Sequence, residues 1–193
     1  MKKNYLYSLR FCLLLIFFSL VMPVQAQDIV VGLRYGYGQN TFTRQSDAVK
    51  TPSYSTQKVG LVGEFFPYYS RLSVLSGVEY EFNKLGKSIT LPLSVRILFG
   101  TTVRPFIEGG GYYTISLDKQ SEDFILKNDL GAKAAAGLQI NLNKHIRMDL
   151  SYTFRYGMTK ALEEEILLPL NQVMIEEYKR KSGSIDLSVK YRF

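Results

Sequence analysis

The C-terminal stretch SGSIDLSVKYRF (residues 182–193) alternates without exception between polar and apolar side chains from Ser184 onward. A period of two places the two sets on opposite faces of a β-strand, whereas a helix would scatter them around its circumference. A soluble protein would turn the apolar face into its core. A membrane barrel would turn the same face out to lipid and the charged face into a closed interior. The fold therefore depends on which face is inside.

The N-terminal residues predict a secretory signal peptide. A basic segment ending at Arg10 precedes the apolar run 11–24, and Val-Gln-Ala at 24–26 forms a small-x-small cleavage site. A transmembrane anchor needs about 20 apolar residues and fits this run poorly. We therefore expect residues 1–26 to be removed and residues 27–193 to form one domain.

Composition excludes several classes of protein for residues 27–193. The single cysteine, Cys12, leaves with the signal peptide, so we expect neither disulfides nor thiolate chemistry. The formal net charge of +7 falls by three when Lys2, Lys3 and Arg10 are removed, so we expect no nucleic-acid partner. No segment approaches about 18 consecutive apolar residues, which argues against a helical membrane protein.

Alternating segments recur along the chain and predict eight β-strands. They exceed the ~5–6 residues usual in soluble proteins and match the ~9–11 tilted residues that cross a bilayer. Short turns at 67–70, 100–104 and 143–145 alternate with joins that are mostly longer, which is typical of an outer-membrane barrel with short periplasmic turns. The expected fold is an all-β, eight-stranded antiparallel up-and-down transmembrane barrel. Its strands are 29–42, 57–66, 71–83, 88–99, 105–117, 128–142, 146–158 and 182–193.

If the apolar faces contact lipid, a nearly balanced set of acids and bases lines the interior. Isolated buried charges cost several kcal/mol, so we expect these residues to pair as a structural plug, with an ion or solute path as the alternative. Aromatic residues near the strand ends and glycines on the inward faces favour the membrane barrel. A secreted, lipocalin-like soluble barrel that binds an apolar ligand is the other reading of the same alternation. The expected interior charges are Arg34, Glu64, Glu79, Glu81, Arg96, Glu108, Lys133, Arg147, Asp149, Arg155, Asp186, Lys190 and Arg192.

Several quoted segments resemble one family of bacterial barrels. The opening VGLRYGYGQNTF, the hairpin KVGLVGEFFPYYSRLSVLSGVEYEF, the pair SITLPLSVRILFG and VRPFIEGGGYY, and the close DLSVKYRF look like the PorT-like small outer-membrane barrels of Bacteroidetes. The resemblance implies a Gram-negative outer-membrane location but no common activity. One branch serves a secretion system, and no motif here assigns the chain to it. Val189, Tyr191 and Phe193 resemble the C-terminal signal that the barrel-assembly machinery reads.

The segment 159–181 is the most distinctive expected external loop. Residues 161–168 and 172–181 have helical character and are separated by Pro169. Such an apolar loop predicts either a lid packed over the barrel mouth or against the outer leaflet, or a docking surface for a partner protein or surface ligand. Its candidate residues are Ile166, Leu167, Leu168, Leu170, Met174 and Ile175.

The expected function is an integral outer-membrane protein with a structural or surface-binding role. Its expected partners are outer-membrane lipid, the assembly machinery and a possible surface partner of residues 159–181. His145, the single histidine, lies in an expected periplasmic turn, so a serine–histidine pair at the outer face is impossible and we expect no enzyme. We expect no metal and no cofactor. A small pore, a secretion-system accessory barrel and a membrane enzyme remain weaker alternatives.

Overall fold

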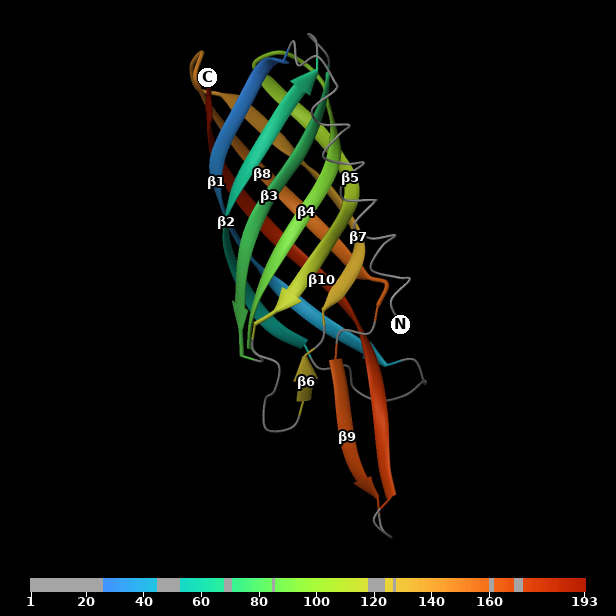
Figure 1. Ribbon diagram of the computed structural model, residues 1–193. Coiled ribbons are helices and arrows are strands. Elements are labelled where there is room, and N and C mark those ends of the chain that lie inside the picture. Colours follow the sequence, from blue (N-terminus) through green and yellow to red (C-terminus); the bar gives the residue numbers. More distant parts are fainter. Residues whose placement is uncertain are drawn as a thin grey trace, which may run out of the picture.

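The structure is a computed structural model that describes residues 26–44, 53–67, 71–84, 86–117, 124–126, 128–159, 162–168 and 172–193. These residues form an all-β fold in which eight long strands make a closed barrel and two short strands extend from one end (Figure 1). No helix in these ranges is long and apolar enough to cross a bilayer. The barrel strands are β1 Ala26–Arg44, β2 Ser53–Pro67, β3 Leu72–Asn83, β4 Gly86–Leu98, β5 Val103–Ser116, β7 Asp129–Asn141, β8 Ile146–Gly157 and β10 Gln172–Arg192, and the short strands are β6 Phe124–Leu126 and β9 Leu162–Leu168.

Each barrel strand pairs with its neighbour in the chain, in the order β1-β2-β3-β4-β5-β7-β8-β10, and the first and last strands close the cylinder. The closing ladder is antiparallel and runs from the pair Val30–Arg192 to the pair Arg44–Tyr178. Closure satisfies the backbone groups that an open sheet edge would leave unpaired, which a span through lipid requires. The expected eight-stranded up-and-down barrel is confirmed, with β1, β2 and β10 longer than the alternation alone predicts.

The faces of the strands have the sidedness of a membrane barrel. Leu150 and Tyr152 on β8 are 53% and 58% exposed, whereas Arg147 and Lys190 are 5% and 1% exposed. The same alternation holds on every barrel strand, so apolar side chains cover the outside and charged side chains fill the inside. This arrangement argues against the lipocalin-like alternative, because a pocket for an apolar ligand needs the opposite sidedness.

A β-ribbon extends the barrel at the end opposite the C-terminus (Figure 1). There β9 pairs with the first part of β10, from Leu162–Tyr178 to Leu168–Gln172, and β6 pairs with β9. The expectation of helices at 161–168 and 172–181 is therefore wrong. The ladder between β1 and β10 continues to Tyr178, so β10 is still extended when it leaves the barrel and offers an edge to β9. Such pairing overrides local helix propensity.

An apolar cluster fills the interior near the short-turn end. It consists of Val30, Phe66, Leu98 and Phe106, which come from the ends of β1, β2, β4 and β5 at that side. The guanidinium carbon of Arg96 lies 3.8 Å from the centre of the Phe106 ring, so the charged part of the interior begins directly on this cluster.

Candidate functional site

The interior charges come together because strand closure directs one residue in two toward a common axis. Of the charged residues that the sequence places inside, all except Arg192 are buried. The Arg192 side chain is 40% exposed at the short-turn end, where β10 ends. Arg147 is buried at the same end and stands apart from the others. The remaining residues form two clusters along the axis of the barrel.

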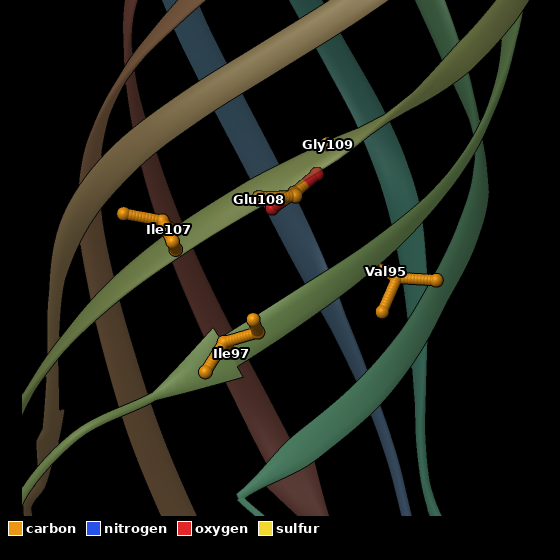
Figure 2. Close-up of a pocket in the computed structure, with 5 residues that line it drawn as sticks. All are labelled: Val95, Ile97, Ile107, Glu108 and Gly109. Atoms are coloured by element: carbon orange, nitrogen blue, oxygen red, sulfur yellow. The ribbon is translucent and has the colours of Figure 1, made fainter.

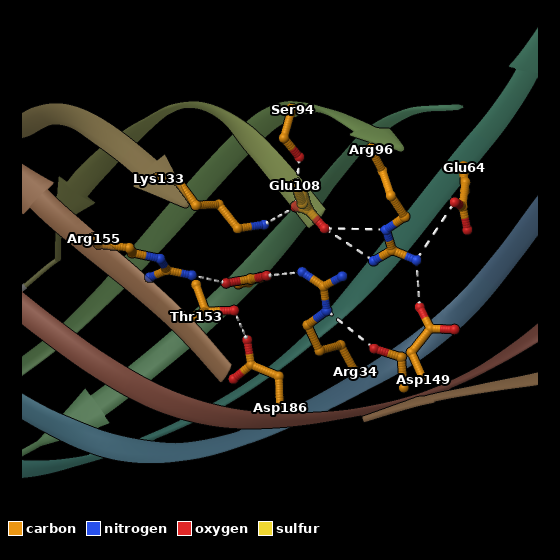
Figure 3. Close-up of polar contacts among 12 residues, drawn as sticks. Arg34, Glu64, Ser94, Arg96, Glu108, Lys133, Asp149, Thr153, Arg155 and Asp186 are labelled. Carbon is orange, nitrogen blue, oxygen red and sulfur yellow. Dashed lines mark hydrogen bonds and ion pairs between the residues drawn. The ribbon is translucent and has the colours of Figure 1, made fainter. Parts of the chain in front are cut away.

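The first, the turn-side cluster, is centred on Arg96. Its Nη1 lies 2.6 Å from Asp149 Oδ2, and its Nη2 lies 2.9 Å from Glu108 Oε2 (Figure 3). Lys190 Nζ lies 2.5 Å from the same Asp149 oxygen, and Lys133 Nζ lies 2.5 Å from Glu108 Oε1. Since β4 and β8 are separated by two strands in the sheet, the contact between Arg96 and Asp149 crosses the lumen. The cluster comprises Glu64, Arg96, Glu108, Lys133, Asp149 and Lys190.

The second, the loop-side cluster, is centred on Arg155, whose guanidinium pairs with both Glu79 and Glu81 on β3. Arg34 Nη1 donates to Glu79 Oε1 at 2.9 Å, and Lys58 Nζ donates to Asp186 Oδ2 at 2.9 Å. These contacts link β1, β2, β3, β8 and β10 across the interior. The cluster comprises Arg34, Lys58, Glu79, Glu81, Asp129, Arg155, Arg180 and Asp186.

Both clusters are electrically neutral, because each contains as many carboxylates as cations. Neutral side chains complete the hydrogen bonding: Ser73 and Ser94 donate to Glu64 and Glu108 at 2.6 Å, and Thr153 donates to Asp186 at 2.7 Å. Buried ions are tolerated when they are paired and their remaining valences are satisfied. Chemically, the arrangement holds the opposite walls of the barrel together.

Three members of the loop-side cluster were missed by the sequence reasoning: Lys58, Asp129 and Arg180. Each lies in phase with a residue that was placed inside, respectively Glu64, Lys133 and Asp186. The signal was therefore present, but the expected strands began too late to include Arg180, and Lys58 and Asp129 stood next to expected strand ends.

The other sequence-predicted residues lie outside the clusters. His145 is in the turn between β7 and β8, where its ring stacks on Tyr191 with 5.6 Å between centroids. The proposed assembly residues Val189, Tyr191 and Phe193 all point outward, and Phe193 is 78% exposed. In the described ranges no group of acidic, histidine or cysteine side chains could hold a metal ion.

The candidate surface residues lie on the external ribbon. Ile166, Leu167 and Leu168 belong to β9, and Met174 and Ile175 belong to β10. Leu170 lies outside the described residues.

A hollow lies on the outer wall between β4 and β5. It is lined by Val95, Ile97 and Ile107 together with Gly109, on which a Cβ would meet nothing within 4 Å (Figure 2). Glu108, also at its margin, turns its carboxylate inward to Arg96 and Lys133. The hollow belongs to the apolar surface of the barrel and contains no reactive group besides that engaged carboxylate.

A closed barrel of eight antiparallel strands with an apolar exterior and a paired ionic interior defines the class of small outer-membrane β-barrels. No family model and no curated protein matches the chain.

Solved structures show the same fold. The N-terminal β-barrel domain of Pseudomonas aeruginosa OprF is 14% identical with a TM-score of 0.56, covering 87% of this chain and 98% of that one. Neisserial surface protein A (NspA) is 11% identical with a TM-score of 0.54, covering 84% and 97%. The outer membrane protein AlkL is 13% identical with a TM-score of 0.56, covering 86% and 90%. At these identities the likeness concerns the fold, and the PorT-like assignment stays a prediction.

Proposed function

We propose that this protein is an integral outer-membrane barrel whose interior is closed by its own ion pairs and which acts through its external end. The observation that carries the proposal is the sidedness of the strands: apolar residues contact the surroundings on every strand, while neutral clusters span the lumen. We expect the barrel to be inserted with its short turns and C-terminus facing the periplasm and with the β6-β9-β10 ribbon facing the medium.

The contacts of the interior charges support a structural plug and argue against a pore. A conducting path needs charged groups that contact passing ions, but Arg96, Lys133 and Arg155 are each directed at carboxylates of other strands. A non-enzymatic role is supported by the same contacts, since an acid or base bound to several cations is poorly placed to exchange protons with a substrate.

The external ribbon supports a binding role. Its strands extend the barrel sheet through the pairing of β9 with β10, and the chain there carries the apolar sequence ILL at 166–168 and VMI at 173–175. Apolar residues on an external element are typical of a surface that contacts a partner. A PorT-like relationship accords with such a role but names no partner.

The test combines membrane extraction with conductance measurements. The purified protein should require detergent, should migrate differently on gels before and after heating, and should show no steady conductance in planar bilayers. A matched variant, Arg34→Ser with Glu79→Ser, removes one cation and one carboxylate from the loop-side cluster without changing the net charge, and should introduce conductance. Recovery in the soluble fraction would contradict the membrane location, and steady conductance of the unaltered protein would contradict the closed interior.

A further inference from the structure

The short-turn mouth of the barrel contains more positive charge than its acids compensate. Arg104 on β5, Arg147 on β8 and Arg192 on β10 all lie at this end, where Asp28 on β1 approaches Arg147 and Arg192. Arg192 and Arg104 are close enough to repel the guanidinium of Arg147, and Glu64 and Asp28 are close enough to attract it. Glu64, however, is already paired with Lys190 and Arg96. This excess contrasts with the neutral clusters deeper in the lumen.

Asp28 is committed to one of these arginines. Its Oδ1 lies 2.5 Å from Arg192 Nη2 and accepts a second hydrogen bond from Arg192 Nε at 2.7 Å. Its Oδ2 lies 3.9 Å from Arg147 Nη2, which is beyond hydrogen-bonding distance. Asp28 therefore pairs closely with Arg192 and only distantly with Arg147.

Arg147 is buried and retains hydrogen-bond donors. The residue is 5% exposed, and its Nη1 has no hydrogen-bond partner among the described residues; the same holds for Arg104 Nε. The guanidinium carbon of Arg147 lies 4.9 Å from the centre of the Phe66 ring. Stacking on an aromatic ring uses the flat face of a guanidinium and leaves the N–H groups in its plane available to a ligand.

We propose that this mouth, the basic rim formed by Arg104 and Arg147, binds an oxyanion of the phosphate or sulfate type. Guanidinium groups donate paired hydrogen bonds to such oxygens, and an unsatisfied buried cation gains far more from an anion than an exposed one does. The apolar cluster below, which includes Phe66 and Phe106, prevents the anion from going deeper. The ligand is either a free oxyanion or the phosphate of a lipid head group that reaches the rim.

The direct experiment is a titration of the full barrel, refolded in a phosphate-free detergent, with inorganic phosphate. Calorimetry should give saturable binding, and NMR should show shifts of the Arg104 and Arg147 side-chain N–H signals. Arg147→Gln and Arg104→Gln should each weaken binding about tenfold, the usual effect of removing one charged donor. Lys144→Gln, which removes an exposed charge from the turn at the same end, is the matched control and should bind normally.

Heat-dependent gel migration establishes that each variant is folded. If Arg147→Gln does not fold, two measurements still test whether the rim binds phosphate. They are the affinity of Arg104→Gln and the NMR shifts of the arginine side chains in the unaltered protein. Absence of saturation, or equal weakening by Lys144→Gln, would overturn the site.

Measurements in nanodiscs distinguish a free oxyanion from a lipid head group. Both lipids carry a phosphodiester, but only phosphatidylglycerol has a net negative head group. Binding of inorganic phosphate that is blocked by phosphatidylglycerol but not by phosphatidylcholine identifies the phosphate of an anionic lipid head group, and equal binding in both identifies a free oxyanion.

Discussion

Arg155 illustrates the constraint on a single residue inside the barrel. It is 3% exposed and pairs with two carboxylates of the opposite wall. Both carboxylates also have a second cation as partner: Arg34 pairs with Glu79, and Arg180 pairs with Glu81. A change at this position is therefore felt by several strands at once.

Reversing this charge should destabilise the barrel strongly. Arg155→Glu would bring a third acid beside Glu79 and Glu81, and the loss of a buried pair alone costs about 3–5 kcal/mol. Unfolding by urea in lipid vesicles, followed by gel migration because the chain has no tryptophan, measures the effect. Lys179→Glu, on the partly exposed part of β10, should change stability by about 0.5 kcal/mol or less. Equal effects of the two reversals would argue against an inward charge network.

Lys133 offers a graded version of the same experiment. Its ammonium contacts Glu108, which also accepts hydrogen bonds from Ser94 and from Arg96 Nη2 at 2.6 and 2.9 Å. Lys133→Met should therefore cost less than Lys133→Glu, because Glu108 keeps its other partners and gains no repulsive neighbour. The free energy of unfolding of both variants, measured under identical conditions, checks the order. The reverse order would mean that position 133 acts through packing and not through charge.

The same residues show what the sequence can and cannot predict about the interior. Alternation indicates which side of a strand a charge occupies, because the side-chain period of two is fixed by backbone geometry. It does not indicate a partner: Arg96 meets Asp149 from a strand that is not its neighbour in the sheet. Such pairs depend on the diameter and stagger of the closed barrel, which no local pattern encodes.

At the scale of one strand, β5 contains two adjacent glycines with opposite requirements. Gly109 faces outward, and a Cβ built on it meets nothing within 4 Å. Gly110 faces inward, where a Cβ would lie 2.2 Å from the carbonyl oxygen of Leu93 on β4. The backbone of β4 approaches so closely here that only glycine fits without a shift of the strand.

Replacing each of these glycines by alanine makes a matched pair of variants. Gly109→Ala should leave stability unchanged or raise it by about 0.4–1 kcal/mol, because alanine restricts the unfolded chain. Gly110→Ala should lower it by about 1–3 kcal/mol through overpacking against backbone. Refolding yield and urea unfolding of the two proteins provide the comparison. A destabilised Gly109→Ala with an unaffected Gly110→Ala would mean that the two faces of β5 are assigned the wrong way round.

The ribbon shows where local patterns mislead at this scale. Residues 161–168 and 172–181 read as helices because leucine, glutamate and lysine favour that conformation locally. In the structure the ladder with β1 keeps β10 extended to Tyr178, and β9 adds to the edge that results. Pairing that begins inside the barrel thus sets the conformation outside it. The barrel strands were predictable because their own alternation and their tertiary pairing agree.

For the whole molecule, we predict the orientation in the membrane from the connections and not from the strands. The turn at Lys84 lies at the same end as the ribbon, since β3 ends beside the start of β2 and the end of β1. The turn at Lys144 lies at the opposite end, beside the C-terminal residues of β10. Both lysines are exposed, so the two positions report on the two sides of the barrel.

Cysteine labelling in intact cells tests this orientation without background labelling of the protein itself, because Cys12 is its single cysteine and lies in the expected signal peptide. Lys84→Cys should react with a membrane-impermeant maleimide on intact cells. Its turn is short, but it lies at the barrel end that carries the longer joins, and in outer-membrane barrels that end faces the medium. Lys144→Cys should react only after the outer membrane is permeabilised. Both variants replace an exposed turn residue and leave the interior clusters intact, so folding should be unaffected. Reaction of Lys144→Cys on intact cells with protection of Lys84→Cys would mean that the barrel is inserted the other way, with the ribbon in the periplasm and the basic rim facing the medium.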